Sequence, residues 1–99
     1  MEIKKEQNGT SLTMSIAGRL DTVAAVDFEK ELEASLPGIT SLVIDCEGLT
    51  YVASSGLRTL LMAQKRMNKQ GSMVMRHVQE SVMEVLAMTG FNDLLTIEK

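Results

Sequence analysis

Several residue types that support particular structures or chemistries are rare or absent in this chain of 99 residues. Tryptophan is absent and aromatic residues make up 3% of the sequence, so any core must be built from aliphatic side chains. The single cysteine, Cys46, excludes an internal disulfide and fits a reducing compartment. One cysteine and one histidine, His77, do not supply the ligand set of a typical zinc site, so we expect no metal and no cofactor.

Charge and long apolar runs are also limited. The net charge is −3 and no basic stripe is present, which argues against a nucleic-acid partner. No run approaches the roughly 18 apolar residues of a membrane span, and the charged first residues Met1–Glu6 do not resemble a signal peptide. We therefore expect a soluble, cytoplasmic protein that does not insert into a membrane.

The apolar residues that are present predict one domain over residues 1–99. They make up 44% of the sequence, which is enough for one core. Asn8-Gly9 predicts a hairpin turn between a short edge strand at Ile3–Glu6 and a strand in which alternate residues are apolar. Further strands are predicted at Leu42–Ile44, where the continuous apolar run suggests cover on both faces, at Met73–Met75, and within Leu94–Ile97.

Three helices are predicted between these strands. Asp21 or Thr22 can cap the first, and Pro37-Gly38 ends it. Its predicted buried face consists of Ala25, Phe28, Leu32 and Leu36. In the second helix, buried positions are predicted at Leu57, Leu60, Leu61 and Met67, and solvent-facing ones at Gln64, Lys65, Arg66 and Lys69. The third has Val82, Val85, Leu86 and Thr89 at helical spacing before Gly90.

This order of elements predicts an α/β fold. Helical crossovers imply parallel strands, so we expect a mixed sheet of four or five strands, with a parallel centre and an antiparallel N-terminal edge strand. The polar run Asp45–Gly48 is interpreted as a break after the third strand. Strand-to-helix turns lie at the carboxyl ends of parallel strands, so Asp21 and Ser54 should lie at one edge.

The turn at Ser54-Ser55-Gly56 supports two interpretations. A serine at the start of a helix is most often a simple cap for free N–H groups. A phosphate on Ser54 would also be tolerated, because its negative charge would lie at the positive end of the helix dipole. Gly56 is unfavourable inside a helix, which indicates that something approaches the backbone closely there.

Known catalytic patterns are missing. The chain has no Walker-type phosphate loop and no G-x-S-x-G elbow, and its acidic residues Glu29, Glu31 and Glu33 spread around a helix surface. His77 is interpreted as a solvated or packed side chain and Cys46 as a buried structural thiol. With no nucleophile–base pair available, an enzyme is disfavoured.

Four segments together resemble the STAS domain of bacterial anti-sigma factor antagonists. They are Gly18–Asp21, Leu42–Asp45, Leu49–Leu61 and Met88–Phe91. The resemblance covers nearly the whole chain in order. It implies a regulator that binds an anti-sigma factor with serine kinase activity and so releases a sigma factor. It also implies phosphorylation at Ser54, with Ser55 as second choice, and places Asp21 near the partner surface.

Two functional hypotheses follow. In the first, the unphosphorylated chain binds the kinase through this edge and phosphorylation of Ser54 ends binding. The expected partner-binding residues are Asp21, Ala53, Ser54, Ser55, Gly56, Leu57 and Arg58. In the second, the chain is a subunit of a transport or other regulatory complex and is never phosphorylated. Many family members carry Asp where this chain has Ala53, and that difference favours the second hypothesis slightly.

Overall fold

Five strands and three α-helices make up residues 1–98, the part of the chain that the computed structural model describes. The strands are β1 (Glu2–Asn8), β2 (Ser11–Leu20), β3 (Ser41–Val52), β4 (Ser72–Arg76) and β5 (Ile97–Glu98). The helices are α1 (Thr22–Ser35), α2 (Ser54–Gln70) and α3 (Glu80–Thr89), followed by the short 3₁₀ helix η1 (Phe91–Asp93). The predicted order of elements is confirmed.

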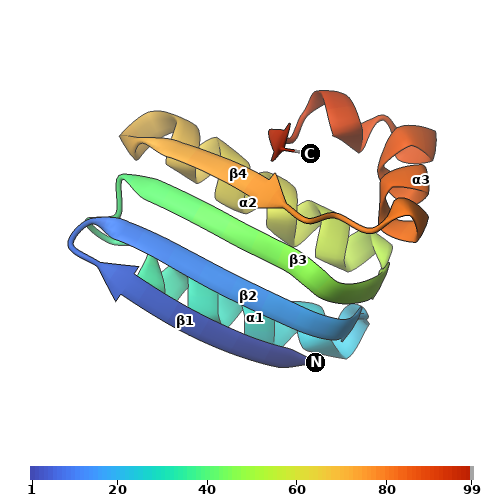
Figure 1. Ribbon diagram of the computed structural model, residues 1–99, viewed down its shortest axis with the longest axis horizontal. Helices are drawn as coiled ribbons and strands as arrows, with labels where there is room; N and C mark the ends of the chain where they lie inside the picture. Colours follow the sequence, from blue (N-terminus) through green and yellow to red (C-terminus); the bar gives the residue numbers. More distant parts are fainter. Residues whose placement is uncertain (99) are drawn as a thin grey trace.

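The strands form one sheet in the order β1-β2-β3-β4-β5 (Figure 1). β1 pairs with β2 in antiparallel fashion through the turn at Gly9, whose φ is +62°. All other neighbours are parallel, as the helical crossovers predict. The predicted α/β fold with a parallel centre and an antiparallel edge is therefore confirmed. Within residues 1–98, no helix is long and apolar enough to cross a membrane.

One face of the sheet is covered more completely than the other. α1 and α2 lie side by side behind the sheet, while α3 lies beyond the carboxyl end of β4 (Figure 1). In β3, Leu42, Ile44 and Cys46 are buried, whereas Val43 and Asp45 on the opposite face are half-buried. The prediction that this strand is covered on both faces is wrong, because the helices pack chiefly on one.

The helices bury most of the predicted side chains. Ala25, Phe28, Leu32 and Leu36 are all buried, which confirms the predicted face of α1. In α2, Leu61 is only half-buried. The prediction that Gln64 faces water is wrong, since this residue is 3% exposed. Its amide is satisfied internally, because its Nε2 donates to Asn68 and its Oε1 accepts from the Thr96 N–H.

Two predicted segments differ from the structure. Asp45–Gly48 is not a break, because β3 runs through it to Val52 and shifts register against β2 twice on the way. Gly48 lies at the first shift, where a Cβ would come within 2.7 Å of the Ala17 Cβ. The last strand is also shorter than predicted, because the chain turns through η1 before Ile97 pairs with Met75.

Candidate functional site

The carboxyl ends of β2 and β3 bring Asp21 and Ser54 to one edge of the sheet, at the starts of α1 and α2 (Figure 1). Asp21 is the N-cap of α1, and its Oδ1 accepts from the Ala24 N–H at 2.9 Å. The Ala53 N–H donates to the Leu20 carbonyl at 2.9 Å. That bond ties together the residues that precede the two helices, so the spacing of the helix starts is fixed by the backbone.

The start of α2 has no side-chain cap. Its N-cap residue is Ala53, whose methyl group cannot accept a hydrogen bond, and neither serine caps the helix. The simple interpretation of these serines as caps is therefore wrong. The first turn also contains no acidic side chain, so the positive end of the helix dipole is not neutralised by its own sequence.

The two serines differ in access. Ser54 is the first residue of α2 and is exposed. Ser55 is half-buried, and its Oγ is both sealed from solvent and without a hydrogen-bond partner within residues 1–98. The Ser55 carbonyl accepts from Thr59 Oγ1 at 3.0 Å. A group that must reach a hydroxyl from solvent therefore meets Ser54 first.

Gly56 explains how closely α2 approaches the sheet. A Cβ at this position would lie 2.7 Å from Leu20 Cγ and 3.1 Å from the Leu20 carbonyl oxygen. The close approach predicted at this glycine therefore comes from the chain's own β2, not from a partner. Leu57, which follows it, is 4% exposed. Both residues seat the helix on the sheet.

A groove lies between α1 and α2 beside Ser55. It has a volume of about 270 Å³ and its lining includes Glu29 and Arg58. Arg58 is exposed, and it takes part in none of the ion pairs found among residues 1–98. Val26 and Met62, which also line the groove, are 51% and 38% exposed. Beside this edge, Arg58 therefore lies next to exposed apolar side chains and has no ion-pair partner among residues 1–98.

A cation–π pair of side chains lies near this edge. The Arg19 guanidinium lies over the Tyr51 ring, 4.1 Å from its centroid. The two residues are direct cross-strand partners in β2 and β3. Sequence reasoning missed the pair because the register shift that aligns them cannot be read from either strand alone.

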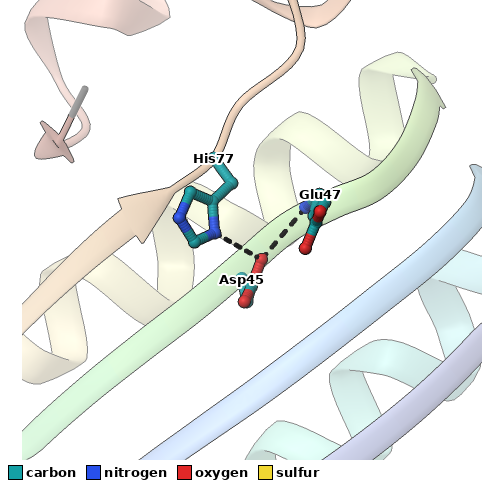
Figure 2. Close-up of side chains that lie close together, drawn as sticks. All are labelled: Asp45, Glu47 and His77. Atoms are coloured by element: carbon teal, nitrogen blue, oxygen red, sulfur yellow. Dashed lines mark hydrogen bonds and ion pairs between the residues drawn. The ribbon is translucent and has the colours of Figure 1, made fainter.

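A separate cluster of Asp45, Glu47 and His77 lies on β3 and just after β4 (Figure 2). His77 Nδ1 and Asp45 Oδ1 are 3.1 Å apart, and the Glu47 N–H donates to the same Asp45 oxygen at 3.1 Å. One potential ligand atom from each residue lies within 4.8 Å of the others. From the sequence, His77 is interpreted as a solvated or packed side chain with no link to these two acidic residues. The i, i+2 spacing of the two acidic residues was the available signal.

Hydrogen bonds and burial shift the pKa values of two residues here, Asp45 and Cys46. Partial burial tends to raise the pKa of Asp45, but the Glu47 N–H, the His77 ring and the Arg76 charge together hold its pKa below the usual 3.8. Cys46 lies between the two acidic residues and points to the covered face. Burial, with a smaller contribution from the Asp45 charge, raises the pKa of its thiol to about 12. The interpretation of Cys46 as a buried structural thiol is confirmed.

Comparison with known proteins gives consistent relatives. The family model described as "Mlab, STAS domain" matches residues 3–96. BtrV of Bordetella bronchiseptica, which is named as an anti-sigma factor antagonist, is 27% identical over 99 residues that cover 98% of this chain and 85% of BtrV.

Solved structures share the fold. An anti-sigma factor antagonist from Mycobacterium paratuberculosis superposes with a TM-score of 0.86 at 20% identity, covering 97% of this chain and 83% of that one. SpoIIAA in its unphosphorylated form gives a TM-score of 0.83 at 16% identity, covering 99% and 89%. The phosphorylated form of Bacillus SpoIIAA gives 0.76 at 15% identity, covering 99% and 92%.

Proposed function

The chain belongs to the STAS domain family, and we propose that it is a cytoplasmic anti-sigma factor antagonist, a binding module and not an enzyme. In this proposal the unphosphorylated chain binds an anti-sigma factor that is also a serine kinase, and so releases a sigma factor. The kinase phosphorylates Ser54, and the phosphorylated chain no longer binds. The names of BtrV and of the structural relatives support the first part.

The observation that carries the switch is the position of Ser54, an exposed residue at a helix N-terminus without a side-chain cap. A phosphate there would add about −1.5 to −2 charges where the helix dipole is positive and where free N–H groups point outward. The fold should therefore accept the phosphate. A partner surface that is apolar or acidic at this point would reject it, because binding would bury or repel the new charge.

Partner contact is divided among the residues of the edge according to exposure. Ser54 and Arg58 are exposed, while Asp21, Ala53 and Ser55 are half-buried, so these five can meet a partner directly. The buried Gly56 and Leu57 act indirectly by fixing the position of α2 on the sheet. Before phosphorylation Arg58, one turn from Ser54, offers a cation to the partner. After it, the guanidinium can pair with the phosphate instead.

The test is a phosphorylation reaction with ATP and a serine-kinase anti-sigma factor from the same organism, read by mass spectrometry. We expect one phosphate on the wild type and on Ser55→Ala, and none on Ser54→Ala. Ser81→Ala is a matched control, because Ser81 is an exposed serine in the first turn of α3. Phosphate that persists on Ser54→Ala would contradict the assigned site.

Binding is measured separately with the kinase and without ATP. Ser54→Glu should raise the dissociation constant at least about tenfold, which corresponds to a loss of about 1.4 kcal/mol of binding free energy. Its melting temperature should stay close to that of the wild type, because a carboxylate at this position suits the helix dipole. Equal affinity of Ser54→Glu and wild type would remove the basis for the switch.

Ala53 supports a second candidate, a STAS subunit of a transport or other regulatory complex that is never phosphorylated. In this candidate the same edge binds a partner permanently, and the missing acidic residue before Ser54 reflects the lack of a kinase. A transporter operon around the gene, together with stable copurification of its product and no phosphate on the cellular protein, would favour it. A neighbouring kinase gene would favour the first candidate.

A further inference from the structure

We propose that Asp45, Glu47 and His77 form a binding site for one divalent transition-metal ion, of which Zn²⁺ is the best fit. The three residues are brought together by the parallel pairing of β3 with β4, in which Asp45 is the partner of Arg76 and His77 follows directly. Asp45 and Glu47 are two residues apart on β3. They flank buried Cys46, and their potential ligand atoms lie near that of His77.

The donor atoms already have nearly the spacing of a coordination shell. Two ligands of a tetrahedral zinc ion, each at about 2.0–2.1 Å, lie about 3.3 Å from one another. His77 Nδ1 and Asp45 Oδ1 are 3.1 Å apart, and one ligand atom from each of the three residues lies within 4.8 Å of the other two. A small rotation of the Glu47 side chain, which is exposed, would close the third side of the triangle (Figure 2).

The chemistry of the donors selects the class of ion. One imidazole and two carboxylates suit Zn²⁺, Co²⁺ or Ni²⁺, whereas Mg²⁺ and Ca²⁺ prefer oxygen ligands alone. The imidazole also separates this cluster from an ordinary group of surface acids. Because His77 is exposed and Asp45 half-buried, coordination positions would remain open to water or to a partner's side chain.

The backbone holds the donors in place. His77 is the only residue other than glycine with a positive φ within residues 1–98, at +58°, and that conformation turns the chain out of β4 as the ring meets Asp45. The Gln79 side-chain amide donates to the Glu47 carbonyl and so joins the segment before α3 to β3. Nearby Arg76 is engaged by Glu98, with its Nε 3.1 Å from a carboxylate oxygen. A bound ion would thus fasten the start of α3 to the sheet.

The experiment uses the full chain without a polyhistidine tag. His77 is the only histidine, so its ring gives a single set of signals in a proton NMR spectrum, and these should shift on addition of Zn²⁺. Calorimetry should give one Zn²⁺ per chain, and Co²⁺ should give visible absorption bands at the same stoichiometry. Mg²⁺ at equal concentration should leave the His77 signals unchanged.

Variants separate ligation from folding. His77→Asn removes the ring, and asparagine tolerates a positive φ, so the backbone can be kept. We expect it to weaken Zn²⁺ binding by at least about tenfold, as should Asp45→Asn and Glu47→Gln. Glu84→Gln, an exposed acid on α3 outside the cluster, should bind like the wild type.

A second readout is thermal. Zn²⁺ in about hundredfold excess over its dissociation constant should raise the melting temperature of the wild type by about 10 °C and that of His77→Asn by much less. Unsaturable binding, or His77→Asn that binds Zn²⁺ as tightly as wild type, would overturn the proposal and leave Asp45–His77 as a simple ion pair. Phosphorylation of Ser54 should be unaffected by His77→Asn, so this test fails or succeeds independently of the proposed switch.

Discussion

The start of α2 and the cluster around Asp45 both depend on β3, but they are held by different forces. At the start of α2, Gly56 packs directly on Leu20 and the Ala53 N–H bonds to the Leu20 carbonyl. In the cluster, the Asp45 carboxylate accepts from the Glu47 backbone N–H and lies 3.1 Å from the exposed His77 ring. The first region is fixed by close packing and backbone bonds, and the second by hydrogen bonds and charge.

The difference predicts how each region responds to its surroundings. Close packing changes little with pH or ions, so the position of Ser54 should be constant until a covalent group is added. Partly exposed polar contacts are weaker and depend on protonation and counterions. β3 therefore leads into a tightly packed helix start at its carboxyl end, and it carries a polar cluster that is sensitive to pH and ions nearer its middle.

The largest expected effect comes from shortening Leu20, the side chain against which the start of α2 packs. Leu20 is fully buried, and Leu20→Ala should lower the free energy of unfolding by about 2–5 kcal/mol, through lost burial and the cavity left behind. Chemical denaturation measures this change. A decrease in the free energy of unfolding of less than about 1 kcal/mol would show that the packing of α2 on the sheet does not depend on Leu20.

A moderate effect is expected from adding volume at the same contact. Gly56→Ala places a Cβ against Leu20 and should cost about 1–3 kcal/mol, measured in the same way. In a Leu20→Ala background the contacts with the Leu20 side chain are gone while the 3.1 Å approach to the backbone carbonyl oxygen remains, so the cost should shrink. Strictly additive effects in the double variant would contradict direct contact between the two residues.

The smallest effect should come from the cluster and should depend on pH. The folded pKa of Asp45 lies below its unfolded value near 3.8, so the Asp45 carboxylate stabilises the fold above that pH. The stability is lost as pH falls through the lower, folded pKa. Asp45→Asn should therefore cost less than about 1 kcal/mol at pH 7 and progressively less as the pH falls below 3.8. Denaturation at several pH values tests this, with Glu84→Gln as control; a cost independent of pH would contradict it.

The same contrast explains what could be predicted from the sequence. The start of α2 is encoded locally, because an apolar strand, two serines, a glycine and an amphipathic helix follow one another in the chain. This order alone places Ser54 at a helix start. The orientation of Ser55 is not encoded in this way, since whether its hydroxyl points outward depends on how tightly α2 sits on Leu20. That distance is set by packing between residues that lie far apart in the chain.

Features that depend on pairing between strands were the ones missed. Asp45–Gly48 suggests a break because four polar or small residues follow an apolar run, yet β2 and β4 keep the strand paired at Asp45. The contact of Asp45 with His77 needs the register of β3 against β4, which no single segment specifies. Gln64 is polar and so suggests a solvent-facing position, whereas a distant backbone N–H, that of Thr96, makes its burial acceptable.

The two register shifts between β2 and β3 have a consequence for the length of the chain. From the first pair, Ser11 with Ser41, to the last, Leu20 with Val52, β3 uses two residues more than its neighbour. Because side chains alternate faces, two extra residues restore parity, and Val52 again points inward beneath the start of α2. Deleting one residue here would send the following helix toward the opposite side of the sheet. Deleting two would keep its side and shorten its reach by about 7 Å.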